Sequence, residues 1–548
     1  MPVSSPTSAF TAEQILFERA IPQADAIPVI FAFPNTYAVG ITSLGYQVIW
    51  GMLASRCDVA VARLFTDIAE PLPRHPELLG FSVSWELDYV NILNLLEAHG
   101  IPLHSQDRQD TDPLIFGGGP VLSANPEPFA DFFDVIVLGD GEGAMDALIE
   151  TYQSVRGATR REKLLQLARV SGMYVPRFYQ PIYHGKGDPF YKLEVTETGI
   201  PFPVERRTYR GRQLSVSTVV TPQAAWENIF MVEVARSCPE MCRFCLASYL
   251  TLPFRAAAVP DHLIPAVEWG LRHTDRIGLL GASVTQHPQF SELLDYLAQD
   301  CFDHVRLSLA SVRTGTVTPR LAEVLRRRGS QSITVAIESG SERLRQIINK
   351  KLSNPEILAA AAAAQMGGLS SIKFYGMVGI PGEIDPDLQD TLDLLVHLKK
   401  VAPRLRYSLG CSTFVPKAHT PFQWYGVDPS AEKKLSSFAK HLRPLGVEFR
   451  PESYNWSVIQ ALIARGDRRV GRVLELARGF GDSLGSYRRA FKALRGELPP
   501  LDHYVFAHWS TDDPLPWGHV QGSLSPERLI DHQQQSAQLM GIPQNRHE

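Results

Sequence analysis

The stretch from Arg236 to Cys245 reads Arg-Ser-Cys-Pro-Glu-Met-Cys-Arg-Phe-Cys and brings three cysteines within eight residues. It follows directly on an apolar run, Ile229-Ala235, which predicts a β-strand. The other three cysteines, Cys57, Cys301 and Cys411, stand singly, so the six do not form a disulfide framework. The clustered cysteines therefore have a local role on one loop at the end of a strand.

Cys238, Cys242 and Cys245 are the predicted ligands of a 4Fe-4S cluster. Three thiolates on one short loop can fold around one corner of a cubane and leave the fourth iron without a protein ligand. One alternative is structural zinc, which needs a fourth Cys or His at finger spacing, and none follows closely. The other alternative is a redox dithiol, which needs a Cys-x-x-Cys pair without a third partner.

An alternation of strands and helices follows the cysteine loop. Apolar runs separated by helical patterns predict parallel strands that form a partial or full barrel, with the chemistry at the carboxyl ends of the strands. The predicted strands are Ile229-Ala235, Ile277-Leu280, Val305-Leu309, Ile333-Ile337, Ile372-Val378 and Tyr407-Phe414, and two predicted helices are Pro319-Arg328 and Asn354-Met366.

The cysteine loop resembles the signature of the radical S-adenosylmethionine (SAM) superfamily, including the aromatic Phe244 before the third cysteine. The resemblance implies that the open iron binds SAM and that an electron entering the sulfonium releases a 5'-deoxyadenosyl radical. Further resemblances follow strand by strand. They imply SAM contacts from Ser283, in a Gly-Ala-Ser stretch that departs from the usual Gly-Gly-Glu. They also imply that Glu338 and Ser341, after the fourth strand, lie in the stretch that contacts the SAM ribose, and that Gly379 and Pro381, after the fifth, lie in the turn on the adenine side. Residues read alone allow plainer roles: Glu338 as a solvated loop acid, and Gly379 as part of an ordinary turn.

Residues 27 to 150 show a second α/β pattern, in which glycines gather where predicted strands end. An open α/β sheet has its ligand crevice at that edge. The segment resembles the cobalamin-binding domain that precedes many radical SAM proteins, although the Asp-x-His-x-x-Gly motif that supplies an axial imidazole is absent, as it is in some cobalamin-dependent members. The resemblance implies cobalamin contacts from Gly117, Gly118, Gly119, Gly139, Gly141 and Glu142. The alternative is a substrate platform whose glycines serve only turns.

The whole chain resembles an uncharacterised subfamily of radical SAM proteins with a cobalamin-binding domain. The predicted fold class is α/β: an N-terminal Rossmann-like doubly wound domain, a radical SAM (β/α) partial barrel and a helix-rich C-terminal region. The predicted boundaries are 1–26 for a leader, 27–150 for the Rossmann-like domain, 151–228 for a connecting segment, 229–424 for the barrel and 425–548 for the helical region, whose polar end from His532 is expected to be disordered.

Composition and charge limit the classes of binding partner and the cellular locations that we expect for the protein. The 54 basic and 58 acidic residues are mixed along the chain, which disfavours a nucleic-acid partner. The absence of a signal-like N-terminus and of long apolar runs predicts a cytoplasmic protein without a membrane partner. We expect a small-molecule or peptide substrate and a reductant such as a flavodoxin or ferredoxin.

Three functions remain open from the sequence. The first is a radical SAM enzyme, cobalamin-assisted, that methylates or rearranges an unknown substrate, or the same chemistry without cobalamin. The second is methylthiolation, which in transfer-RNA-modifying relatives uses three further N-terminal cysteines, whereas only Cys57 is available here. The third is a non-catalytic iron-sulfur and SAM-binding sensor. The catalytic residues beyond the cofactor ligands are not predicted.

Overall fold

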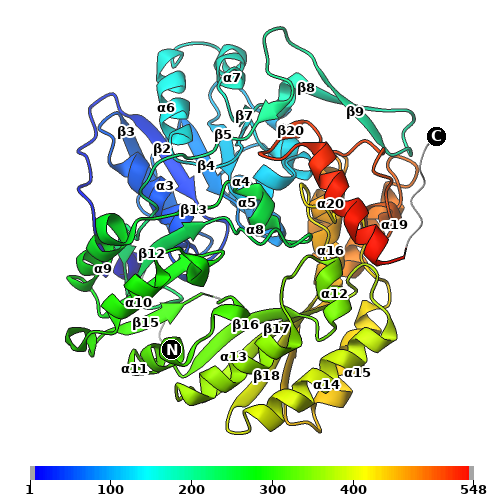
Figure 1. Ribbon diagram of the computed structural model, residues 1–548. Coiled ribbons are helices and arrows are strands. Elements are labelled where there is room, and N and C mark those ends of the chain that lie inside the picture. The colour runs from blue at the N-terminus through cyan, green and yellow to red at the C-terminus, as the bar shows by residue number, and fades with distance from the viewer. Residues whose placement is uncertain (1–5, 311, 542–548) are drawn as a thin grey trace.

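The N-terminal part of the chain folds around a six-stranded sheet with the strand order β3-β2-β4-β5-β6-β7, in which only β7 is antiparallel to its neighbour. The computed structural model describes residues 6–310 and 312–541. Helices cover both faces of this sheet (Figure 1). The strands are β2 (Ile27–Ala32), β3 (Val59–Leu64), β4 (Leu78–Ser82), β5 (Leu114–Gly118), β6 (Val135–Val137) and β7 (Met173–Tyr174), and the helices are α3 (Leu44–Ala54), α4 (Tyr89–Ala98), α5 (Pro120–Ala124), α6 (Ala144–Ser154) and α7 (Arg160–Ala168).

The middle of the chain forms two four-stranded sheets that together make a split barrel. Their strand orders are β13-β12-β14-β15 and β16-β17-β18-β19. An isolated parallel bridge between Val312 and Val335 connects the two halves. The strands are β12 (Ile229–Arg236), β13 (Arg255–Ala256), β14 (Arg276–Gly281), β15 (Arg306–Leu309), β16 (Ser332–Glu338), β17 (Ser371–Val378), β18 (Arg406–Thr413) and β19 (Glu448–Pro451).

Helices pack against the outer face of this split barrel, as Figure 1 shows for α9, α10, α11, α13, α14 and α15. Alternation along β17 explains which face is buried: Ile372 and Phe374 are fully buried beneath the helices, whereas Tyr375 is 39% exposed on the opposite face. The helices are α8 (Leu246–Leu250), α9 (Ile264–Leu271), α10 (Phe290–Leu297), α11 (Pro319–Arg327), α12 (Glu342–Ile347), α13 (Asn354–Met366), α14 (Asp385–Val401) and α15 (Ala431–Leu442).

The C-terminal helices between residues 454 and 505 belong to the core of the N-terminal sheet and not to that of the barrel, whereas the last helix packs against a separate cluster with Tyr249 and Trp424. Buried side chains such as Ile459 and Leu474 lie in one apolar cluster with Ile30 and Leu79. The barrel strands and their helices form a separate cluster. The C-terminal helices are α16 (Tyr454–Arg465), α17 (Val470–Gly479), α18 (Leu484–Ala493), α19 (Leu501–Val505) and α20 (Pro526–Leu539).

Short strand pairs connect these parts. A hairpin is formed by β8 (Tyr179–Tyr183) and β9 (Phe190–Val195), while β10 (Val204–Glu205) pairs with β20 (Val520–Gln521) and β1 (Gln14–Ile15) with β11 (Val219–Val220). Near the N-terminus lie α1 (Pro6–Thr11) and α2 (Tyr37–Gly40). The predicted domain boundaries stay predictions, and residues 1–5 and 542–548 of the outer segments lie outside the described residues.

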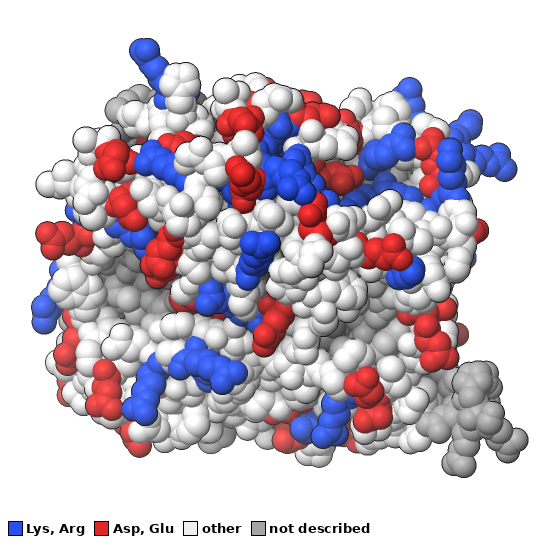
Figure 2. All heavy atoms as spheres, turned by 90° about the horizontal axis from the view of Figure 1, so that it is seen from above, with Lys and Arg blue, Asp and Glu red and all other residues white. Residues whose placement is uncertain are grey.

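The α/β fold class with parallel sheets and a helix-rich C-terminal region is confirmed. The expected disorder from His532 onward is wrong as far as residue 539, because α20 continues to Leu539. Within the described part of the chain, no helix combines the length and apolar character needed to cross a bilayer. The face in Figure 2 carries acidic and basic side chains intermixed, without an extended area of one sign.

Candidate cofactor and active site

The cysteine loop leaves β12 through two residues in the left-handed backbone region, Ser237 (φ 68°) and Met241 (φ 55°). The Cys245 N–H donates to the Cys242 carbonyl (2.9 Å), which closes the second half of the loop into a turn. Asn349 fixes the first half, because its side-chain amide donates to the Met241 carbonyl (2.9 Å). The loop is therefore held from outside by the segment that follows α12.

Arg243, between the second and third cysteines, fastens the loop to α12. Its side chain is buried and donates to the carbonyls of Gln346 (3.0 Å) and Ile347 (2.7 Å) at the C-terminal end of that helix. The last carbonyls of a helix lack the usual i+4 partner, so a buried guanidinium is well suited to them, and the Gln346 carbonyl also accepts from the Asn349 N–H (3.0 Å). Its other amino group donates to Gln535 of α20 (3.2 Å), which brings the C-terminal helix against the cysteine loop.

The three thiols are shielded from solvent: Cys242 is buried, and Cys238 and Cys245 are partly buried. Burial raises the pKa of Cys242 to about 12, Lys350 opposes this shift, and the neighbouring charges of Cys245, Glu338 and Cys238 reinforce it. Burial also raises the pKa of Cys245. In the described residues, no three His, Cys, Asp or Glu side chains converge on one metal ion. A cubane does not require such convergence, because each thiolate binds a different iron, and the cluster ligands stay a prediction.

Glu338 lies at the end of β16 with an unusual backbone, φ 62°, after a break in the strand register. Left-handed strain at a non-glycine residue is typical of functional positions. Its carboxylate accepts from Lys350 Nζ (2.9 Å), and both side chains are about nine-tenths buried. Because both charges act on Cys242, the predicted ribose-contacting acid and the cysteine loop are neighbours.

The two serines predicted to contact SAM have their hydroxyls engaged within the protein. Ser341 caps α12 by accepting from the Leu344 N–H and donates to Asp387 Oδ1 (2.6 Å). Ser283 is 5% exposed and donates to Gln286. The structure thus gives Ser341 a capping role, while its part in SAM binding stays a prediction, as does that of Ser283.

The turn after β17 fits the predicted adenine side. Gly379 (φ 72°) has a left-handed backbone, and its N–H donates to Glu383 (2.8 Å). Pro381 is buried in the same turn. Phe244 packs against the apolar cluster that contains Ile380 and Phe414 of the neighbouring strand ends. The cysteine loop and this turn therefore meet around one apolar cluster at the carboxyl ends of the strands.

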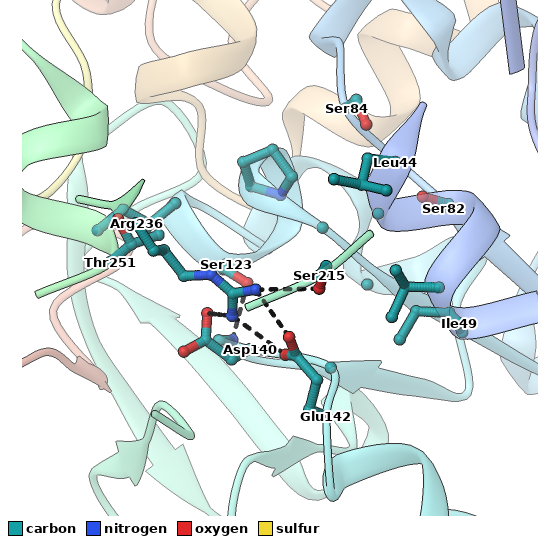
Figure 3. A pocket seen from close by; sticks show the side chains of 18 of the residues that line it. Leu44, Ile49, Ser82, Ser84, Ser123, Asp140, Glu142, Ser215, Arg236 and Thr251 are labelled. Carbon is teal, nitrogen blue, oxygen red and sulfur yellow. Dashed lines mark hydrogen bonds and ion pairs between the residues drawn. The ribbon is translucent and has the colours of Figure 1, made fainter. Parts of the chain in front are cut away.

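A cavity of about 450 Å³ lies between the carboxyl edge of the N-terminal sheet and the strand that carries the cysteines. Five of the six residues predicted to contact cobalamin line it: Gly118, Gly119, Gly139, Gly141 and Glu142. From the barrel side the cavity is lined by Arg236, Ser237 and Gly281. Cys238, the first of the three cysteines, therefore directly follows a residue that lines the cavity. The remaining wall is largely apolar with several hydroxyls and holds no histidine among its described lining residues, and Figure 3 shows Leu44, Ile49, Ser82, Ser84 and Ser123 around it.

Gly117 differs from the other glycines, because it faces away from the cavity. A Cβ atom there would lie 2.4 Å from the Phe133 ring, on the side of the sheet that packs against the core. Gly139 lines the cavity, but a close crossing also requires it, since a Cβ would lie 2.1 Å from the Arg207 carbonyl oxygen. The close approach of the Arg207 backbone therefore explains the glycine at position 139 without a ligand.

An ion-pair network joins the N-terminal sheet to the cysteine strand beside this cavity (Figure 3). Arg236 pairs with Glu142 (2.7 Å) and Asp140 (3.3 Å) from the loop after β6, and with Glu233 (2.7 Å) of its own strand. Asp140 also pairs with Arg255 (2.9 Å). The side chain of Glu142 is thus committed to Arg236, two residues before Cys238.

Sequence reasoning gave no role to Arg236, Arg243 and Lys350. Arg236 and Arg243 lie inside the cysteine motif itself, and this position was the signal that could have identified them as functional residues. Lys350 offered none, because its pairing with Glu338 depends on the turn of α12 between them.

Family models match both halves of this site. The model described as "Radical SAM proteins, N-terminal" matches residues 69–176, and the model described as "Radical SAM superfamily" matches residues 232–395, which include all three cysteines. Residues 232–395 therefore form a radical SAM domain, and the segment before it matches the N-terminal region of radical SAM proteins.

Similar proteins extend over most of the chain. The uncharacterised protein MJ0966 of Methanocaldococcus jannaschii is 27% identical over 82% of this chain and 91% of its own length. The tRNA-2-methylthio-N(6)-dimethylallyladenosine synthase of Bdellovibrio bacteriovorus is 24% identical over 30% of this chain and 39% of its own. Among solved structures, the methyltransferase TsrM of Kitasatospora setae with cobalamin and a [4Fe-4S] cluster bound covers 94% of this chain and 98% of its own, at 12% identity and a TM-score of 0.49.

Proposed function

We propose that this radical SAM enzyme cleaves SAM reductively at a 4Fe-4S cluster on Cys238, Cys242 and Cys245, and that its N-terminal cavity holds cobalamin for methylation or rearrangement of a substrate. The observation that carries the proposal is that one cavity has the glycine-rich strand ends of the N-terminal sheet on one side and Arg236 and Ser237 of the cysteine strand on the other. Two cofactors held there would be adjacent.

The residues of the chain suit the first cofactor. A cluster on the three thiolates would supply the electron that cleaves SAM into methionine and a 5'-deoxyadenosyl radical. Arg243 and Asn349 hold the loop in place, and the buried Glu338, paired with Lys350, offers a carboxylate for sugar hydroxyls. Phe244 supplies an apolar surface beside the Gly379 turn.

Support for cobalamin comes from the chemistry of the cavity wall. Cobalamin would supply a carrier for the methyl group. Apolar side chains such as Leu44 and Ile49 suit a large flat ligand, while Ser82 and Ser84 offer hydroxyls to its amide groups. The lining contains no histidine among the described residues, so a cobalamin bound here would receive no axial imidazole from the wall.

Alternatives are tested by the cofactors that the protein retains. Without cobalamin, the N-terminal domain would be a substrate platform for the same radical chemistry. A non-catalytic sensor would bind the cluster and SAM without turnover. Methylthiolation is disfavoured, because Cys57 is the lone cysteine before the loop. The reductant, a flavodoxin or ferredoxin, and the cytoplasmic location stay predictions.

The experiment is anaerobic reconstitution with iron, sulfide and cobalamin, followed by desalting, an absorption spectrum and assay of 5'-deoxyadenosine after reduction. We expect a cluster, near-stoichiometric cobalamin and SAM cleavage. Cys242→Ala should abolish cleavage, whereas Cys301→Ala, which alters an exposed single cysteine, should not. Cleavage retained in Cys242→Ala would refute the cluster assignment. A cluster without cobalamin would refute the second half of the proposal, and a cluster that binds SAM without cleavage would favour the sensor.

A further inference from the structure

Tyr375 is an exposed aromatic side chain in the middle of the barrel sheet β16-β17-β18-β19. Helices α13, α14 and α15 cover one face of this sheet (Figure 1), whereas Tyr375 is 39% exposed on the other, inner face. Its register partners on the two neighbouring strands are Ala336 and Gly410. A Cβ atom at Gly410 would lie 3.2 Å from the Tyr375 ring, so the ring lies over the glycine. Small neighbours on both sides therefore leave the ring open to a ligand.

Lys373 lies two residues earlier in β17, on the same face of the sheet. Its Nζ donates to the Tyr375 hydroxyl oxygen (3.1 Å) and lies 4.6 Å from the centre of the ring. The register partners of Lys373 are Thr334 and Ser408, and neither of their hydroxyls bonds to another described residue. Neighbouring strands are about 5 Å apart, so the ammonium, the Tyr375 O–H and these two hydroxyls form one group of hydrogen-bond donors.

The charge on this inner face is positive and unbalanced. Lys373 makes no ion pair with a described residue, and neither does Arg406, which lies on the same face at the start of β18. The two acids in the strands of this sheet, Glu338 and Glu448, are already paired with basic side chains. An ammonium beside three hydroxyls, without a carboxylate, suits an oxyanion, because all four groups can donate to it.

The same face leads toward the cysteine loop. Met377, two residues beyond Tyr375, packs in the apolar cluster that also contacts Phe244. A strand rises about 3.3 Å per residue, so the backbone of Lys373 lies about 13 Å from that of Met377. A ligand whose anionic group contacts Lys373 can therefore extend over Tyr375 to the end of the barrel that carries the cysteines.

We propose that Lys373, Tyr375, Thr334 and Ser408 bind the anionic group of the substrate, a carboxylate or a phosphate. The ammonium supplies the charge, the three hydroxyls supply further donors, and the Tyr375 ring packs against the part of the substrate next to the anionic group. A contact this far from the reacting atom serves to bind and orient the substrate. The inference rests on the proposed function in naming the ligand as the substrate.

The test measures binding of three small ring compounds to the full chain by calorimetry: phenyl phosphate, benzoate and the neutral benzamide. We expect an anion to bind about tenfold more tightly than benzamide, because the anion alone makes a charge-assisted contact with Lys373. Tighter binding of phenyl phosphate would identify a phosphate as the group that the site prefers, and tighter binding of benzoate would identify a carboxylate. Equal affinities for all three compounds, or no binding of either anion, would overturn the proposal.

Variants test whether the anion binds on this face of the sheet. Lys373→Met should weaken binding of the preferred anion about tenfold, and Tyr375→Phe, which keeps the ring and removes one donor, should weaken it less. Lys400→Met is the matched control, because Lys400 is exposed on α14 and makes no ion pair with the described residues, and it should bind as wild type does.

Equal affinities of wild type and Lys373→Met, or an equal loss of affinity in Lys400→Met, would overturn the proposal. Lys373→Met should unfold at the wild-type temperature, because it loses no ion pair with the described residues. The binding measurement uses neither SAM nor a reductant, so its outcome does not depend on whether the protein cleaves SAM.

Discussion

Gly139 provides the sharpest test of how the cavity wall is built. An alanine there would carry the strain of φ 95° and place its Cβ 2.1 Å from the Arg207 carbonyl oxygen. Two hydrogen bonds depend on this crossing, from Asp140 N–H to the Arg207 carbonyl (2.9 Å) and from Arg207 N–H to the Leu138 carbonyl (2.9 Å). The left-handed strain costs about 1–2 kcal/mol and the overpacking about 1–3 kcal/mol. Weakening the bonds adds roughly 1 kcal/mol, so Gly139→Ala should destabilise the protein by about 3–6 kcal/mol.

Two other glycines separate the cost of backbone strain from the cost of the steric clash. Gly143 (φ 70°) has nothing within 4 Å of an added Cβ, so Gly143→Ala should cost only the strain of about 1–2 kcal/mol. Gly118 lines the cavity in an ordinary backbone conformation, with its nearest neighbour, the Val137 oxygen, at 3.5 Å, so Gly118→Ala should be nearly neutral. Denaturant midpoints of the three variants rank the costs. Equal loss of stability in Gly139→Ala and Gly143→Ala would refute the crossing argument.

Three further predictions concern charge. Lys350→Met leaves the Glu338 carboxylate buried without its partner and should cost about 3–5 kcal/mol in thermal unfolding and weaken SAM binding, whereas unchanged SAM affinity would separate Glu338 from the ribose. Burial raises the pKa of Asp88 to about 6 against 3.8, so its cost is absent below pH 4 and complete above pH 6; Asp88→Asn should match wild type at pH 4 and exceed it by about 1–2 kcal/mol at pH 7, after discounting for partial exposure, and a pH-independent difference would contradict this. Arg236→Met leaves three acids with one remaining arginine and should lower the unfolding temperature more than Glu142→Gln does, so the reverse order would count against the network.

Local patterns predicted the parts of the fold that local physics decides. The six expected barrel strands all occur, because each is an apolar run: β17 is buried at every second residue, whereas β12 and β14 are buried at consecutive residues. The helix Asn354–Met366 has the predicted bounds, since Ser353 and Glu356 form a capping box at its start. Sequence patterns did not predict the edge strand β3 (Val59–Leu64). Its position in the sheet depends on pairing with β2, which the local sequence does not show.

Tertiary contacts decided what the sequence did not show. The stretch from His532 looks disordered by composition, yet α20 is fixed by single polar contacts: Gln535 accepts from Arg243, and Gln533 donates to Tyr425 (3.0 Å). Tertiary contacts also decide the cofactor site, because the sequence motif indicated the cysteines but not Lys350, which pairs with Glu338. Hydrogen bonds between distant segments leave no periodic trace, so such partners are visible only in the folded chain.

Charged side chains help to fix the position of the cysteine strand relative to the cavity. The N-terminal sheet and the barrel have separate apolar cores, and the C-terminal helices α16 to α19 belong to the first of them. At the cavity, Arg236 bridges the two parts through Asp140 and Glu142, both from the loop after β6. Parallel strands deliver their loops to one edge, so the carboxyl ends of both sheets can face a single cavity. Any ligand that contacts Glu142 there therefore acts on the residue two positions before Cys238, which couples occupancy of the cavity to the geometry of the cysteine loop.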